Sequence, residues 1–325
     1  MRVYHHPNTI DLDKPVITLG LFDGVHRGHQ LLISSLLNSA ADRSVEALVV
    51  TLWPHPRIVL GKHDGSFTLL STLEEKLWLL EKFGVKHCWV IRFDETLASM
   101  QAEEFIRHYL TGPFIPSGMV IGDDHHFGRN AGGDLQTLKA AGAEHGFRVE
   151  HINSHLEGST RISSSFIRAC LSAGDLISAN RLLGYPYLMI GQVEEGKKLG
   201  RSLGFPTANI HCCEVWKHIP ADGVYAVRVD WQDVCYDGML NIGLRPTIDD
   251  HDRRTIEVHL FGVGEDLYGD ELRIHFIQRL RDEMRFGSLE ELREQLGRDR
   301  ELALKVLGEW RDQGNSYLCR DSGRD

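Results

Sequence analysis

The first half of the chain, up to about residue 184, alternates short hydrophobic runs with segments whose apolar residues recur every three or four positions. The runs predict strands and the periodic segments predict helices. The expected strands are residues 16–21, 46–52, 87–93, 118–121 and 147–152, and the expected helices include residues 31–37, 102–110 and 135–145. A further helix begins after the capping-box pattern at Thr72 and ends at Gly84. Strands that alternate with helices predict a parallel sheet covered on both faces.

The pattern changes after Gly184. Short strands joined by Gly, Pro, Asn and Asp turns are expected at residues 187–193, 224–231, 234–242, 255–261 and 271–280. A single helix is expected from Leu289 to about Trp310. Mostly antiparallel strands with one helix predict a small barrel with a closing helix. We therefore expect domains at residues 1–184 and 185–312, followed by a polar tail at 313–325.

The turn between the first expected strand and helix is the most informative stretch of the chain. It reads GLFDGVHRGHQ from residue 20, and Gly20, Phe22, Asp23, Gly24 and Gly28 are its expected nucleotide-binding residues. The N–H groups of a helix start favour a phosphate. His26 and His29 are three residues apart and share one face of the first helical turn. Such a turn suits nucleotidyl transfer, which needs positioning and hydrogen-bond donors on the triphosphate.

Two other interpretations of this histidine pair are open. His26 and His29 could be capping or surface residues, although the preceding strand and the three glycines favour a ligand site. Histidine is also a common zinc ligand. No third and fourth ligand follow at a recognisable spacing, which argues against zinc.

In the second half, the most specific motif is GRSLGFPTAN at residues 200–209. In an extended chain Thr207 and Asn209 face the same way, about 7 Å apart, and offer two neutral oxygens. Such oxygens suit a Mg²⁺ ion that completes its shell with water and phosphate. The loop before them is flexible and cationic, and it would lie over the phosphates; its nucleotide-binding residues are Lys197, Lys198, Gly200 and Arg201. Residues 191–197 resemble a Walker A loop, but Lys198 follows instead of Ser or Thr, so we reject that interpretation.

A carboxylate lies in the expected strand at residues 255–261. Its apolar residues alternate with Thr255, Glu257 and His259, which therefore share the other face. Glu257 could take a proton from a substrate hydroxyl, as a general base does when an alcohol is phosphorylated. Taken alone, Glu257 fits a solvent-exposed strand residue better.

Composition narrows the possible partners. The chain has 325 residues and a formal net charge of −10, with no dense basic run, which argues against a nucleic-acid partner. Its six cysteines show no metal or secreted-framework spacing, which fits reduced thiols in the cytoplasm. We expect no membrane segment, because the chain lacks a signal-like N-terminus and an apolar run of 18 residues. We expect a monomer or a weak homo-oligomer.

Over nearly its whole length the chain resembles the prokaryotic bifunctional riboflavin kinase/FMN adenylyltransferase (FAD synthetase) family. The matching motifs, in order, are GLFDGVHRGHQ, PHP, AEEFI, GDDHHFG, RISSSFIR, GRSLGFPTANI, GVYAV, NIGLRPT, EVHLF, DLYGDELRIHF and LRDEMRFGSLEEL. The resemblance implies a Rossmann-like N-terminal domain that adenylylates FMN to FAD with release of pyrophosphate. It implies a C-terminal barrel that phosphorylates riboflavin to FMN. The implied substrates are ATP, riboflavin and FMN.

The resemblance also implies roles for single residues. His26 and His29 would hold the ATP phosphates, joined by three residues at the start of a later helix, Ser164, Ser165 and Arg168. Thr207 and Asn209 would hold Mg²⁺, and Glu257 would deprotonate the ribityl 5′-hydroxyl. Asp124 and Arg281 would contact the flavin; a surface role for Arg281 is equally open.

The chain departs from the family pattern at two positions. Where the family has arginines, this sequence has His126 and Ala131, and Arg129 is a possible substitute in space. Fewer fixed cations weaken the grip on a polyanion. We therefore expect a bifunctional enzyme, with a riboflavin kinase whose adenylyltransferase is weakened as the alternative. A flavin-sensing regulatory protein is a more distant possibility.

Overall fold

The computed structural model describes residues 1–61, 65, 67–122, 125–152, 156–157, 160–195, 204–245, 253–264 and 267–314. Two compact units are present. The first unit comprises residues 1–69 and 76–164, and the second comprises residues 70–75 and 165–325. The expected division at residue 184 differs from this packing, because residues 165–184 belong to the second unit by their contacts.

A six-stranded parallel sheet forms the first unit, in the order β1-β4-β3-β2-β5-β6. Its strands are β1 (Arg2–Tyr4), β2 (Val16–Leu19), β3 (Ala47–Trp53), β4 (His87–Arg92), β5 (Gly118–Gly122) and β6 (Arg148–Ile152). The five expected strands are confirmed. The three-residue strand β1 was not expected, because a run that short carries no readable periodicity.

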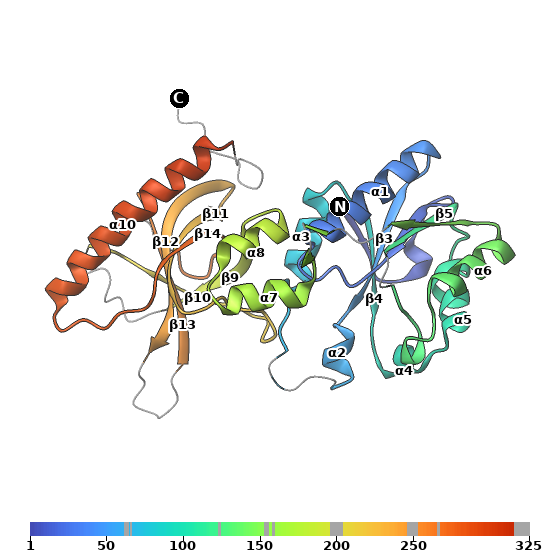
Figure 1. Cartoon of the computed structure of the whole chain (residues 1–325), viewed down its shortest axis with the longest axis horizontal. Coiled ribbons are helices and arrows are strands. Elements are labelled where there is room, and N and C mark those ends of the chain that lie inside the picture. Colours follow the sequence, from blue (N-terminus) through green and yellow to red (C-terminus); the bar gives the residue numbers. More distant parts are fainter. Residues whose placement is uncertain are drawn as a thin grey trace. The chain divides into compact units, whose positions relative to one another are not determined.

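Helices cover both faces of this sheet, as the strand-helix alternation predicted (Figure 1). They are α1 (Arg27–Asp42), α2 (Pro56–Val59), α3 (Leu73–Lys82), α4 (Glu95–Ser99), α5 (Ala102–Phe105) and α6 (Leu135–His145). Alternate strand residues such as Ile17, Leu19 and Leu48 pack against α4, α5 and α6 in one core. The helix expected at 102–110 is only partly regular, because α5 is followed by a π-helical turn at Ile106–Thr111.

The second unit is built on a closed six-stranded antiparallel barrel, in the order β10-β13-β12-β11-β14-β9. Its strands are β9 (Tyr187–Glu194), β10 (Ala208–His211), β11 (Gly223–Trp231), β12 (Val234–Arg245), β13 (Arg253–Leu260) and β14 (Glu271–Arg281). The closing helix α10 (Leu289–Asp312) packs on Ala226 and Met239 of the barrel (Figure 1). Two shorter helices, α7 (Ser164–Ser172) and α8 (Leu176–Leu183), precede the barrel. The predicted barrel and its closing helix are confirmed.

A buried ion pair lies within the second unit. Lys217 Nζ lies 2.6 Å from Glu75 Oε2, and neither side chain is exposed. The same ammonium group donates to the carbonyl oxygens of Leu70 and Leu188, while Glu75 accepts from the backbone N–H of Ile190. All three protons of the lysine are therefore used. A buried pair with complete hydrogen bonding tolerates the loss of neither partner.

We expect Glu75→Gln to lower the free energy of unfolding by about 3–5 kcal/mol, because it leaves the Lys217 charge buried without a counter-ion. Urea unfolding of the full chain measures the change. The matched control is Glu74→Gln, at the exposed neighbouring position. Equal stability of the two variants would contradict the structural role of this pair.

Candidate active sites

The turn between β2 and α1 brings the predicted histidines together. The backbone passes through the left-handed region at Phe22, Gly24 and Val25 before the helix begins at Arg27. Gly20 allows the fully buried Phe22 ring to lie against it, since a Cβ at Gly20 would meet that ring at 3.0 Å. His26 is the N-cap residue of α1, which places His29 in the first turn of the helix.

The two imidazoles stack on one another. Their ring centroids lie 3.7 Å apart at an interplanar angle of 14°, and Phe22 meets His29 edge-on at 5.3 Å. Both Nδ1 atoms are buried, and neither has a hydrogen-bond partner within the part of the chain that is described. A buried polar atom without a partner is costly. This pair is therefore suited to contact a ligand.

Burial keeps these histidines uncharged. It lowers the pKa of His26 to about 4, and it lowers the pKa of His29 well below its usual range, with smaller contributions from His26 and Lys76. At neutral pH both rings are therefore neutral hydrogen-bonding groups.

Lys76 is a buried residue that the sequence patterns did not indicate. Its side chain is 2% exposed, and its Nζ lies 3.5 Å from Thr51 Oγ1. Burial lowers the pKa of Lys76 to about 8, while Asp23 acts in the opposite direction. Lys76 therefore places a positive charge near the predicted nucleotide-binding turn. Neither helix periodicity nor motif spacing marks such a lysine.

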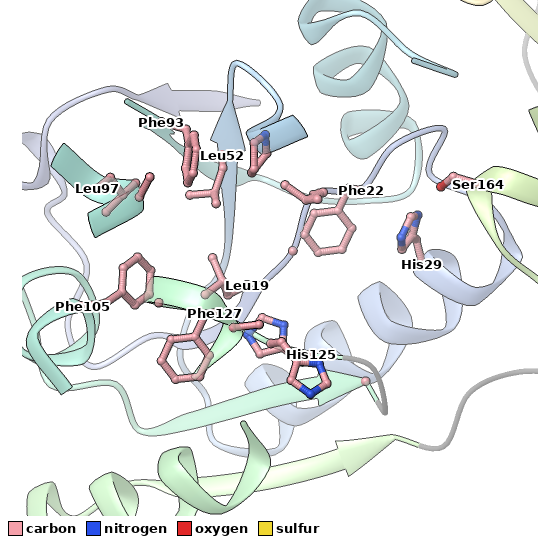
Figure 2. Close-up of a pocket in the computed structure, with 18 of the residues that line it drawn as sticks. Leu19, Phe22, His29, Leu52, Phe93, Leu97, Phe105, His125, Phe127 and Ser164 are labelled. Carbon is pink, nitrogen blue, oxygen red and sulfur yellow. The ribbon is translucent and has the colours of Figure 1, made fainter. Parts of the chain in front are cut away.

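A cavity of about 1030 Å³ opens beside the turn. Its apolar part includes Leu52, Phe93, Leu97, Phe105 and Phe127, whereas His29 and Ser164 lie at the other end (Figure 2). A cavity of this size, mostly apolar with a few convergent polar groups, is typical of a small-molecule site. Its two ends suit a ring system and a phosphate-bearing group respectively.

Six of the ten residues that were predicted to bind nucleotide in the first unit lie at this cavity. Those that line it are Gly20, Phe22, His26, Gly28, His29 and Ser164. The carbonyl of Asp23 accepts a hydrogen bond from Ser164 Oγ at 3.0 Å, which ties the turn to the start of α7. Asp23, Gly24, Ser165 and Arg168 are not among the lining residues that the structure describes. Arg168 instead donates to Ser165 Oγ at 3.1 Å.

The segment in which the sequence departs from the family pattern also lines the cavity. His126, Arg129 and Ala131 all line it, as does His125. The Nε2 atom of His125 is buried without a hydrogen-bond partner among the described residues, and burial lowers the pKa of this histidine to about 4. The predicted flavin residue Asp124 lies outside the described residues, as do Lys197, Lys198, Gly200 and Arg201.

The second site lies on the barrel. Thr207 Oγ1 donates to Glu257 Oε2 at 3.2 Å. Asn209 and Asn241 both pair directly with Glu257, from β10 and β12 on either side of β13. Residues directly opposite in antiparallel strands share one face. Thr207, Asn209 and Glu257 therefore form one oxygen-rich cluster, which suits the hard cation Mg²⁺.

His259 supports this cluster from the same face of β13. Its Nδ1 lies 2.7 Å from the carbonyl oxygen of Pro206, and the rings of Phe205 and Phe261 flank it edge-on at 5.5 Å. Burial lowers the pKa of His259, so that the neutral ring donates from Nδ1 to Pro206. His259 thus holds the backbone directly before Thr207. Strand alternation placed His259 beside Glu257, but did not reveal this contact.

Arg281 is the predicted flavin residue at the end of β14. Its guanidinium forms a salt bridge with Asp299 of α10 at 2.6 Å, and Nε donates to the same carboxylate at 2.8 Å. Asp299 is 2% exposed and also accepts from Gln295. In this structure Arg281 therefore connects the barrel to its closing helix.

Comparison with known proteins identifies two domains in the chain. Residues 9–166 match the FAD synthetase family model, and residues 183–307 match the riboflavin kinase model. The bifunctional riboflavin kinase/FMN adenylyltransferase of Escherichia coli K12 is 37% identical over 309 residues, covering 95% of this chain and 97% of that protein. The same-named protein of Bacillus subtilis is 35% identical, covering 94% and 97%.

This chain belongs to the bifunctional riboflavin kinase/FMN adenylyltransferase family. It is an enzyme of FAD biosynthesis that carries both domains, as the motifs predicted. A solved structure from Streptococcus pneumoniae, titled a macrolide-efflux protein, has the same fold with a TM-score of 0.82 and 29% identity, covering 93% of this chain and 98% of that one. No helix among the described residues is long and apolar enough to cross a membrane.

The buried neutral histidines predict a loss of stability in acid. Between pH 6.5 and 4 the unfolded chain protonates His26 while the folded chain does not, so the free energy of unfolding falls as the pH decreases. The contribution of His26 reaches up to about 3 kcal/mol at the acid end. Urea unfolding at pH 7, 5.5 and 4.5 should show a smaller loss for His26→Asn than for the wild-type chain. Identical losses would mean that His26 is protonated in the folded state.

Proposed function

We propose that the two activities of this enzyme use separate residue sets, one on the β2–α1 turn and one on the barrel. The turn residues would serve adenylyl transfer from ATP to FMN, and the barrel cluster would serve phosphoryl transfer from ATP to riboflavin. The distance of 3.2 Å between Thr207 and Glu257 is the observation that carries the barrel assignment. The proposed domain limits remain residues 1–184 and 185–312, with a tail at 313–325.

In the proposed kinase step, Glu257 accepts the proton of the ribityl 5′-hydroxyl as that oxygen attacks the γ-phosphorus of ATP and ADP leaves. A base must lie within hydrogen-bond reach of the proton that it takes. Thr207 and Asn209 would hold Mg²⁺, which supplies positive charge for the phosphates when bound. His259 would keep Thr207 in place through Pro206. Lys197, Lys198, Gly200 and Arg201 would border the ATP phosphates, and Arg281 would help enclose the flavin.

In the proposed adenylyl transfer, a phosphate oxygen of FMN attacks the α-phosphorus of ATP and pyrophosphate leaves. His26 and His29 would donate hydrogen bonds to the phosphates as neutral imidazoles, because their pKa values are lowered. Donors fixed in advance at the developing charge stabilise such a transition state. Further contacts would come from Gly20, Phe22, Asp23, Gly24, Gly28, Ser164, Ser165 and Arg168 on the phosphates, and from Asp124 on the flavin.

We further propose that the enzyme works in the cytoplasm, on small molecules rather than nucleic acid, as a monomer or weak homo-oligomer. Five of its cysteines, Cys88, Cys170, Cys212, Cys213 and Cys235, are free thiols. Free thiols fit a reducing compartment. The net charge of −10 disfavours a polyanionic partner.

Glu257→Gln tests the barrel assignment. We expect it to lower the rate of FMN formation from riboflavin and ATP by at least about 10²-fold, in line with the loss of a general base. FAD formation from supplied FMN should stay within about twofold of the wild type. Chromatographic separation of riboflavin, FMN and FAD measures both steps. Loss of both activities in a folded variant would contradict separate sites.

His29→Ala is the reciprocal test. It removes a hydrogen-bond donor from the cavity, so FAD formation should fall by about 10²-fold, as when a transition-state donor is removed. FMN formation should not change. The matched control is His108→Ala, an exposed histidine on the π-helical turn. A parallel loss of kinase activity would overturn the assignment of His29.

A further inference from the structure

The cavity of the first unit is poor in positive charge. Among the lining residues that the structure describes, Arg129 is the one with a permanent positive charge, and Glu95 carries a negative one. The imidazoles of His26, His29 and His125 are neutral at pH 7, because burial lowers the pKa of each. Both ATP and FMN carry phosphate, so the lining as described offers one fixed charge for anionic substrates.

Arg129 is available for a ligand. Within the described ranges no carboxylate lies within salt-bridge distance of it, and its side chain is exposed. Other arginines of the chain are already engaged, such as Arg43 with Glu150 at 2.7 Å and Arg254 with Asp222 at 2.6 Å. An unengaged guanidinium at a cavity wall offers several hydrogen-bond donors in a geometry that matches phosphate.

The backbone around Arg129 is firmly held. Its own N–H donates to the carbonyl oxygen of Met100 at 2.7 Å, and Phe127 and Gly133 exchange two backbone hydrogen bonds of 3.1 and 2.9 Å. Gly128 packs directly on α5, where a Cβ would lie 2.8 Å from Ala102 Cα. This loop therefore fixes the position from which the guanidinium extends.

The turn itself has an unusual conformation. Asn130 and Ala131, which directly follow Arg129, both lie in the left-handed region, at φ 55° and 57°. Such residues are costly and occur where the surroundings hold them, often at ligand sites. Their conformation belongs to the same tight turn that carries Arg129 along the cavity wall.

We propose that Arg129 is the residue that neutralises substrate phosphate in this cavity, in the role that the family pattern gives to arginines at positions 126 and 131. The inference rests on the proposed use of this cavity for adenylyl transfer. The recognised chemistry is a phosphate group, which either ATP or FMN can supply. His126 and Ala131, which stand at the positions of the family's arginines, carry no fixed positive charge that could neutralise phosphate.

The test compares Arg129→Gln and Arg129→Lys with the wild-type full chain in FAD formation, varying ATP and FMN separately. The matched control is Arg107→Gln, an exposed arginine that does not line the cavity. Because Arg129→Gln removes a charge-assisted hydrogen bond to phosphate, kcat/KM should fall about 10- to 100-fold in this variant. Arg129→Lys should lose less of the wild-type kcat/KM than Arg129→Gln does. Arg107→Gln should keep the wild-type kcat/KM.

Whichever substrate shows the loss identifies the phosphate that Arg129 holds. A fall of less than fivefold in kcat/KM for both substrates overturns the proposal, as does an equal effect of Arg107→Gln. FMN formation from riboflavin by the same preparation shows that each variant is folded. A wild-type chain that forms no FAD would overturn the adenylyltransferase assignment and this inference together, whereas a fully active Arg129→Gln variant overturns this inference alone.

Discussion

The first site depends on a short stretch of backbone that leaves the sheet, buries an aromatic ring and enters a helix within seven residues. Left-handed conformations at Phe22, Gly24 and Val25 make that path possible. As a result His26 occupies the N-cap position of α1, His29 stacks on it, and the Nδ1 atoms of both rings are buried. The burial that fixes their geometry also keeps them uncharged. Position and protonation state therefore have the same physical cause.

The second site is fixed differently, by strand register. Asn209, Glu257 and Asn241 are neighbours because β10, β13 and β12 pair at these residues. A shift of one residue in either pairing would turn the carboxylate toward the barrel interior. The buried alternate residues Ile256, Val258 and Leu260 oppose such a shift, since it would expose them. The burial of apolar residues on one face of β13 thereby fixes the position of the polar cluster on the other face.

Periodicity and motif spacing predicted the parallel sheet, the barrel and the main clusters, because these follow from alternation along the chain. Alternation placed Thr207 and Asn209 on one face and Glu257 on the polar face of its own strand, but the family resemblance, not alternation, implied that they share a site. The burial of Lys76 was not predictable, since it depends on how α3 packs. The support of Pro206 by His259 was equally hidden, because it joins residues 53 positions apart. The π-helical turn after α5 was not predictable either, because its segment has the periodicity of an ordinary helix.

The placement of residues 70–75 has a consequence for dissecting the chain. This segment precedes most of the first unit in sequence, yet it packs with the barrel and supplies Glu75 to Lys217. A fragment that starts at residue 185 would keep the lysine and lose the carboxylate, along with the carbonyl oxygen of Leu70. The isolated barrel would therefore hold Lys217 without its counter-ion and with one of its three hydrogen-bond acceptors left, the carbonyl oxygen of Leu188. The kinase half thus shares its hydrogen-bonding network with a segment from the first half of the sequence, and the boundary of a fragment decides whether that network is kept.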